Sequence, residues 1–320
     1  MLVRFGGTRG SLPVAQRADA TLTRIVHALI SARGRAFANE AEAADFARTE
    51  IEFATHGTYG GATPCVEIEG GDDAFFVCDM GSGLREFGLS ARRRCAEGHP
   101  RLYHIFLSHL HWDHIMGFPF FRPAHESGAR IVIHSAHPDA EKALRRQQEA
   151  ISFPVPFDAL KARLEFAIHR PRETFEVAGM RVSLIDQSHA GGTIGYRFER
   201  DGKAVVYSTD AEHKPDDMDQ EAAFEGFFAK ADLVICDTMY SLGEAVSLMQ
   251  DRGHSSNIVA VDLCHAAGAR RLALFHHEPS HSDEDIQQMF FETVRYEKMV
   301  RGGRPELEVV CAYDGLEIEL

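Results

Sequence analysis

The stretch Ser108-His109-Leu110-His111-Trp112-Asp113-His114 places three histidines and one aspartate within six residues. It follows the apolar run Leu102–Leu107, which predicts a β-strand, so these side chains fall at the strand's carboxyl end, where α/β sheets place their chemistry. His109 and His111 point the same way in extended backbone and can bind one cation together. Asp113 and His114 come one turn later and can bind a second cation.

A solvated, histidine-rich loop is the alternative interpretation of this stretch. Burying three imidazoles and a carboxylate so close together is costly without a compensating cation, and the spacing therefore favours a metal site. Nitrogen and oxygen ligands of this kind suit Zn²⁺, Mn²⁺ or Fe²⁺. Histidine is also the outlier of the composition, because the chain holds 18 histidines and five of them lie between His99 and His114.

The hexapeptide HLHWDH (109–114) resembles the metal-binding motif of the metallo-β-lactamase superfamily. The resemblance extends along nearly the whole chain. It points to the branch that holds the tRNA-processing ribonuclease Z together with cyclic-nucleotide and other small phosphodiesterases. Three glycine-rich segments carry the resemblance to this branch: FGGTRGS (5–11), YGGATPC (59–65) and DMGSG (79–83). Taken alone, these segments indicate only turns and close backbone approaches.

The resemblance implies three further ligands, each after a predicted strand. They are, with the strand in parentheses, His189 (Met180–Ile185), Asp210 (Lys203–Ser208) and His276 (Arg271–Phe275). By similarity, one cation would be held by His109, His111 and His189, and the other by Asp113, His114 and His276, with Asp210 bridging them. His277 is the alternative for the last position, and His276 is preferred because it directly follows the strand.

A further segment, Gly253-His254-Ser255-Ser256, resembles the part of the phosphodiesterase branch whose histidine donates a proton to the leaving group. Asp237, in ICDTMY, lies where that branch keeps an acidic partner for the histidine. Such a pair makes chemical sense, because a carboxylate fixes the tautomer of an imidazole and stabilises the imidazolium. Alternatives stay open: His254 as a helix-start histidine without a role, and Asp237 without a catalytic part. Asp79 either orients the ligands through hydrogen bonds or is a turn aspartate.

Hairpins and strand–helix units alternate along the chain and are repeated in two halves. This rhythm predicts an α/β fold of two packed mixed sheets with helices on both outer faces, and the resemblance implies the four-layer αββα sandwich. No proline- and glycine-rich linker divides residues 1–320, which predicts one domain. The Ala-rich segment at about 15–56 has helical apolar spacing and is expected to form a helical insertion. It would act as a lid or an oligomer contact, or only cover the core.

The formal charge is −14, from 34 Lys and Arg against 48 Asp and Glu. Proteins that grip long nucleic acids carry a basic face, so this charge argues against such a partner. The cluster Arg92-Arg93-Arg94 fits a solvated helix face better than a phosphate patch. No apolar run spans a bilayer and no signal-peptide pattern opens the sequence, so a cytoplasmic location is expected. The six cysteines form no CxxC pair, which predicts buried free thiols.

These features predict a metal-dependent hydrolase, namely a phosphodiesterase for small anionic phosphodiesters such as cyclic nucleotides. Its cofactors would be two divalent cations, and the chain could form a homodimer. Asp113 would bind metal and orient the nucleophile, while His254, supported by Asp237, would protonate the leaving group. The alternatives are a ribonuclease Z-like endonuclease and an ester, lactone or thioester hydrolase on the same core. A non-enzymatic regulatory module is disfavoured because all seven candidate ligands are present.

Overall fold

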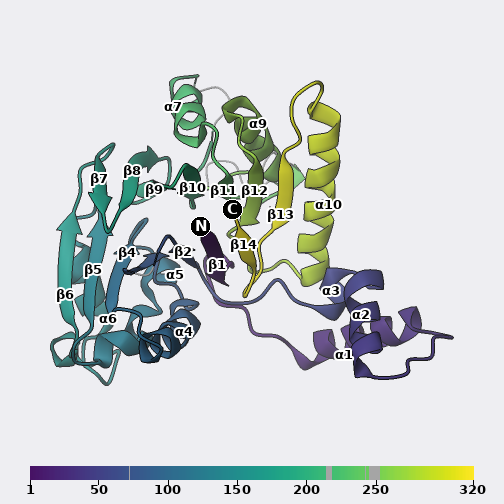
Figure 1. The fold of residues 1–320 in the computed structure, drawn as a ribbon, viewed down its shortest axis with the longest axis horizontal. Helices are drawn as coiled ribbons and strands as arrows, with labels where there is room; N and C mark the ends of the chain where they lie inside the picture. Colours follow the sequence, from purple (N-terminus) through teal and green to yellow (C-terminus); the bar gives the residue numbers. More distant parts are fainter. Residues whose placement is uncertain (72, 214–217, 242, 245–252) are drawn as a thin grey trace.

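The computed structural model describes residues 1–71, 73–213, 218–241, 243–244 and 253–320, and its strands form two seven-stranded sheets (Figure 1). The first sheet has the strand order β14-β1-β2-β3-β4-β5-β6. Its strands, in chain order, are β1 (Leu2–Gly7), β2 (Cys65–Glu69), β3 (Phe75–Cys78), β4 (Leu102–Phe106), β5 (Arg130–Ser135), β6 (Arg163–Ile168) and β14 (Glu317–Glu319).

The second sheet has the order β13-β12-β11-β10-β9-β8-β7. Its strands are β7 (Thr174–Val177), β8 (Met180–Gln187), β9 (Thr193–Arg200), β10 (Lys203–Ser208), β11 (Leu233–Asp237), β12 (Arg271–Phe275) and β13 (Glu308–Cys311). Both sheets are mixed, as predicted. The strands from β3 to β6 run parallel, and so do those from β10 to β13. The pairs at the other end of each sheet are antiparallel.

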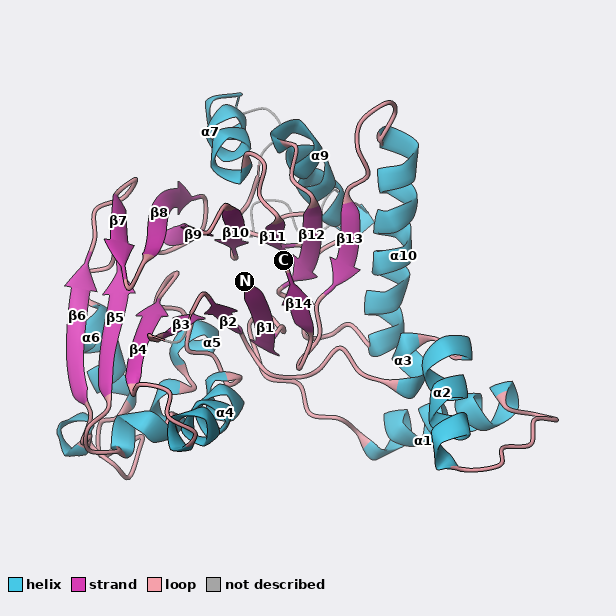
Figure 2. Ribbon diagram, viewed as in Figure 1, coloured by secondary structure: helices cyan, strands magenta, loops and turns pink. Residues whose placement is uncertain are grey.

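Helices cover the outer face of each sheet, which confirms the predicted four-layer αββα arrangement. Figure 2 shows α4, α5 and α6 beside the first sheet, and α7, α9 and α10 beside the second. The described helices are α1 (Ala18–Ser31), α2 (Glu40–Glu50), α3 (Phe53–His56), α4 (Leu84–Ala96), α5 (Trp112–Ile115), α6 (Ala140–Gln147), α7 (Met218–Phe228), α9 (Asn257–Ala267) and α10 (Asp283–Val300). Short 3-10 helices are η1 (Phe118–Phe120), η2 (Arg122–His125) and η3 (Phe157–Ala159).

Three clusters of buried apolar side chains fill the spaces between these layers. One joins the facing sides of the two sheets and includes Phe106 and Phe198. The second packs the first sheet against its helices and includes Tyr103 and Ile105. Neighbouring β4 side chains such as Ile105 and Phe106 therefore point to opposite faces of the sheet and pack in different layers, as the two-residue period of a strand requires. The third cluster packs the second sheet against α9 and α10.

The segment expected to form a helical insertion contains α1, α2 and α3 (Figure 1). Neither α1 nor α2 buries a side chain, whereas α3 buries Ala54 and packs Phe53 against Tyr59 and Tyr313. Within the described ranges, no helix is both long and apolar enough to cross a membrane.

The packing bears on two smaller predictions. All six cysteines are free and, except for the half-buried Cys95, buried. In the basic cluster, Arg94 forms an ion pair with Glu67 at 2.7 Å, and Arg92 forms one with Glu126 at 2.5 Å. These contacts engage two of the three arginines within the fold.

Candidate metal centre

The seven predicted ligands lie at the carboxyl ends of four strands drawn from both sheets. His109 and His111 follow β4, and Asp113 and His114 lie in the one-turn helix α5 directly behind them. His189, Asp210 and His276 follow β8, β10 and β12, respectively. Because β10 and β12 both run parallel to β11, their carboxyl ends lie at the same edge of the sheet.

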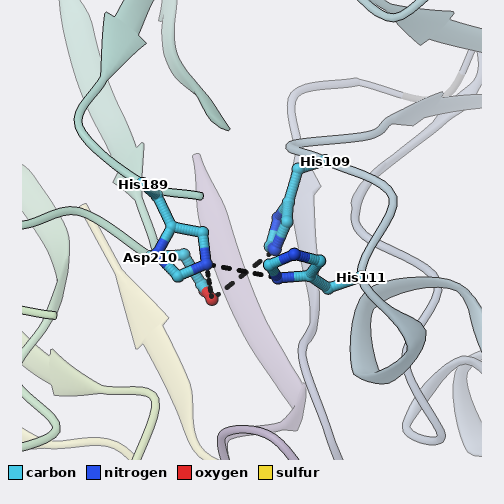
Figure 3. Close-up of side chains that lie close together, drawn as sticks. All are labelled: His109, His111, His189 and Asp210. Carbon is cyan, nitrogen blue, oxygen red and sulfur yellow. Dashed lines mark hydrogen bonds and ion pairs between the residues drawn. The ribbon is translucent and has the colours of Figure 1, made fainter. Parts of the chain in front are cut away.

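The first cluster consists of His109, His111, His189 and Asp210, which offer one ligand atom each within 4.8 Å of one another. Figure 3 shows the three imidazoles and the carboxylate converging on one point from opposite sides. His189 Nε2 lies 3.2 Å from His111 Nδ1. Asp210 Oδ2 lies 3.6 Å from the Nε2 atoms of both His109 and His189.

The second cluster consists of Asp113, His114, Asp210 and His276, all of them buried. Asp210 Oδ1 lies 3.1 Å from the Nε2 atoms of both His114 and His276, and Asp113 Oδ2 lies 3.2 and 3.4 Å from the same two atoms. Asp210 therefore turns one carboxylate oxygen toward each cluster. The resemblance assigns Asp210 the bridging position between the two clusters.

The donor atoms of both clusters fit divalent cations. His109 Nε2 is buried and has no hydrogen-bond partner among the described residues. The Nε2 atoms of His114 and His276 face each other at 3.3 Å, with two carboxylates beside them. Carboxylates and imidazoles that converge in this way offer the oxygen and nitrogen ligands that Zn²⁺, Mn²⁺ and Fe²⁺ accept.

Buried carboxyl groups in these clusters are ionised at neutral pH. Burial raises the pKa of Asp113, but the facing imidazoles of His114 and His276 outweigh it and hold this pKa well below the usual range. The same balance, with His276 and His114 as the largest opposing contributions, lowers the pKa of Asp210. Burial lowers the pKa of His109, which keeps its imidazole neutral and able to bind a cation.

Asp79 orients His114 by accepting a hydrogen bond from its Nδ1 atom. The side chain is fully buried, and its Oδ2 accepts hydrogen bonds of 2.7 Å from His114 Nδ1, Ser108 Oγ and Tyr207 Oη. Its Oδ1 accepts a fourth bond, also of 2.7 Å, from the Ser108 amide. A proton held on Nδ1 of His114 leaves the Nε2 lone pair free to face the second cluster. Of the two interpretations that the sequence left open for Asp79, this network favours the orienting role.

Two backbone contacts that sequence reasoning missed hold other candidate ligands. The amide of Ser11 donates to Asp113 Oδ2 at 2.8 Å, and His189 Nδ1 donates to the carbonyl oxygen of Gly253 at 2.8 Å. Gly253 has a φ of +81°, and a Cβ there would lie 2.4 Å from His189 Nδ1, so only glycine fits. The segments FGGTRGS and GHSS contained both residues, but nothing in their letters indicates which backbone atom is used.

His276 and His277 play different structural parts. His276 Nε2 lies in the second cluster, whereas His277 Nε2 donates to the carbonyl oxygen of Ala312 at 2.8 Å. Burial lowers the pKa of His277 to about 3, which keeps this ring neutral. The geometry therefore places His276, and not His277, with the other predicted ligands.

His254 and Asp237 form the predicted pair beside both clusters. His254 Nδ1 lies 2.7 Å from Asp237 Oδ2, and the buried carboxylate also accepts hydrogen bonds from the amides of Ala211 and Met239. The His254 ring stacks on His276 with centroids 5.2 Å apart and lies 5.1 Å from the ring of His189. Burial lowers the pKa of His254, but Asp237 outweighs burial and raises it to about 9.

Comparison with known proteins agrees with this geometry. A family model described as the beta-lactamase superfamily domain matches residues 75–277, more than half of the chain. That range contains the seven candidate ligands and the pair formed by His254 and Asp237. A search of curated protein sequences gave no match.

Solved structures share the fold at low sequence identity. The metallo-beta-lactamase fold protein YhfI from Bacillus subtilis is 16% identical, with a TM-score of 0.62 over 100% of this chain and 98% of that one. A diphosphatase of the PhnP family is 18% identical, with a TM-score of 0.61 over 100% and 97% of the two chains. Yeast PDE1 is 15% identical, with a TM-score of 0.60 over 81% and 95%. At these identities, the likeness shows the fold alone.

Proposed function

Because the chain belongs to the beta-lactamase superfamily, we propose that it is a metal-dependent phosphodiesterase acting on small phosphodiesters such as cyclic nucleotides. The observation that carries this proposal is the 2.7 Å contact between His254 and Asp237, placed beside both ligand clusters. Cleavage of an alkyl phosphodiester releases a poor leaving group, which needs a proton. A positioned imidazolium supplies that proton.

Two divalent cations would be held by the two clusters. One would bind His109, His111 and His189, the other Asp113, His114 and His276, with Asp210 touching both. Such a pair supplies Lewis acidity toward the phosphoryl oxygens and a nucleophilic water at neutral pH. Two ligand carboxylates do not cancel two double charges, so the centre favours an anionic substrate although the whole chain carries −14.

Asp113 is the residue that would orient the attacking water. The Ser11 amide and the imidazoles of His114 and His276 fix its carboxylate, so it can orient the water without moving. Fixed groups of this kind need no reorganisation as charge develops in the transition state.

His254 acts on the opposite side of the phosphorus. Its Nδ1–H donates to Asp237 Oδ2, which fixes the ring and leaves Nε2–H as the proton donor. As the bond between phosphorus and the leaving oxygen breaks, the Nε2 proton passes to that oxygen, and the product alcohol leaves neutral. Asp237 stabilises the imidazolium until this transfer and is itself held by two backbone amides.

Comparison of two leaving groups tests the proposal. His254→Ala should lower kcat on a cyclic nucleotide by about 10²–10⁴-fold, the usual contribution of a general acid. The loss should be much smaller on bis(p-nitrophenyl) phosphate, because p-nitrophenolate departs without protonation. Metal content must stay at the wild-type value in the variant. His27→Ala, on the exposed face of α1, is the matched control and should leave both rates unchanged.

Two outcomes would contradict the proposal. Equal losses on both substrates would remove His254 from leaving-group protonation. An enzyme that cleaves esters or lactones but neither phosphodiester would support the alternative hydrolase on the same centre. A panel with a tRNA precursor beside the cyclic nucleotides separates the endonuclease alternative.

A further inference from the structure

A groove of about 840 Å³ opens beside the loop that carries the first ligands. One wall consists of Trp112 and Phe120, from α5 and η1, and Phe153 adds a third aromatic ring. Lys142 and Arg146, from α6, also line the groove. The groove therefore begins at Trp112, the residue between the candidate ligands His111 and Asp113 in the sequence.

The aromatic side chains of this groove are exposed rather than used in the core. Trp112 is 67% exposed and Phe120 is 59% exposed, and the Phe120 and Phe153 rings meet edge to face at 5.4 Å. Large exposed rings beside a site offer an open π face to a ligand. Stacking on such a platform is how proteins bind nucleobases without strong sequence preference.

The cations of α6 differ in their freedom. Lys142 Nζ lies 3.7 Å from Asp139 Oδ1, and Arg145 pairs with Glu141 and Asp158. Among the described residues, no carboxylate lies within ion-pair distance of Arg146, so its guanidinium is available to a ligand. A guanidinium matches the acceptor atoms on the edge of a purine, as in its bidentate pairing with guanine. Exposed aromatic rings beside an unpaired guanidinium therefore fit a planar base that has hydrogen-bond acceptors on its edge.

We propose that this groove binds the base of a nucleotide-type phosphodiester, with the ring stacked on Trp112 and Phe120 and its edge on Arg146. The proposal deepens the phosphodiesterase function, on which it rests, by giving the base its own site. The phosphate would lie on the ligand clusters, because Trp112 stands between the candidate ligands His111 and Asp113 in the chain. Trp112, Phe120 and Arg146 are then specificity residues, not catalytic ones.

Trp112 is the only tryptophan of the chain, so its fluorescence reports on this groove alone. The metal-loaded full chain is titrated with guanosine 5′-monophosphate and, separately, with ribose 5-phosphate, which has the same phosphate and sugar without the base. The base-bearing ligand should quench the fluorescence saturably, and ribose 5-phosphate should not. Arg146→Ala should raise the Kd for guanosine 5′-monophosphate about tenfold, within the usual range for one bidentate base contact.

Arg145→Ala is the matched control, because Arg145 lies on the same helix, is engaged by two carboxylates and does not line the groove. It should leave the Kd unchanged. Equal quenching by both ligands, no saturable quenching, or equal weakening in both arginine variants would overturn the proposal. No turnover is needed for this readout. Phosphodiester cleavage without base-dependent quenching would refute the groove alone, and quenching without cleavage would refute the phosphodiesterase function alone.

Discussion

Replacing Asp79 with Asn tests whether the metal centre depends on a residue that does not belong to either cluster. The carboxylate receives four hydrogen bonds of 2.7 Å, one on Oδ1 from the Ser108 amide and three on Oδ2, among them the bond from His114 Nδ1. An Asn amide keeps the volume but turns an NH₂ group toward one of these sides. In one orientation it faces the Ser108 N–H, and in the other it faces His114 Nδ1–H.

The expected losses of stability and of metal affinity follow from these two orientations of the amide. An NH₂ against the Ser108 amide leaves a buried donor without an acceptor, which costs about 1–3 kcal/mol of stability. An NH₂ against His114 is relieved only if the imidazole proton moves to Nε2, the atom that faces Asp113 and Asp210. That tautomer removes His114 as a ligand. Losses of about 10–100-fold in metal affinity are usual when such a supporting hydrogen bond is lost.

Three measurements separate these effects: chelator-competition titration for metal affinity, urea unfolding of the metal-free chain for stability, and imidazole ¹⁵N shifts for the His114 tautomer. Asp232→Asn is the matched control, because Asp232 is also buried and accepts from the Ala204 amide and Arg270. It lies directly before β11, at the opposite end of that strand from Asp237. It should lose stability and keep wild-type metal affinity. Wild-type metal affinity in Asp79→Asn, with only a stability loss, would refute the orienting role.

Two further predictions use other parts of the chain. His276→Ala should lose tightly bound metal, whereas His277→Ala should lose stability alone, because its ring donates to the Ala312 carbonyl, packs against Tyr59 and belongs to neither cluster. Metal analysis of both variants checks this, and the reverse result would exchange their assignments. Burial lowers the pKa of His134 to about 3, so below the unfolded value of about 6.5 the unfolded chain binds a proton that the folded chain excludes, and stability falls on acidification by about 1.4 kcal/mol per pH unit. His134→Gln should remove about one proton from the pH dependence of the unfolding free energy measured in urea between about pH 4 and pH 5.5, and an unchanged slope would contradict this.

The strands that deliver the ligands could be predicted closely because each is a short apolar run with a sharp polar end. Observed β10 and β12 have the predicted bounds, and β8 extends the prediction from Ile185 to Gln187. The edge strands β6 and β14 were missed. Half-buried β6 alternates Arg163 and Glu165 with apolar residues, and three-residue β14 is defined by its pairing with β1 across the whole chain. Edge strands depend on partners that lie far away in sequence, which local pattern does not contain.

The candidate ligands could be found from sequence because chemistry restricts them to a few residue types at strand ends. The atoms that support them could not be found in this way. Tyr207 reaches Asp79 across 128 positions, and the contacts of Ser11 and Gly253 use main-chain atoms that every residue possesses. Only the folded arrangement selects which amide or carbonyl comes within hydrogen-bond distance. Sequence therefore predicts which side chains can bind a cation, while the packing determines which hydrogen bonds fix the orientation of each side chain.

The backbone conformation shows what it costs to orient these side chains toward the clusters. Asp79, Asp210 and His276 each stand directly after a strand or two residues beyond one, with φ of +61°, +45° and +64°. Residues other than glycine rarely adopt this left-handed conformation, and each instance costs on the order of 1–3 kcal/mol. Glycine would remove the strain, but it has no carboxylate or imidazole to offer. The side chain's contacts must therefore offset the strain, as the four hydrogen bonds of Asp79 do and as cations would do for Asp210 and His276. At these three converging strand ends, the strained backbone carries side chains that lie in or beside the ligand clusters, which ties the backbone of both sheets to the metal centre.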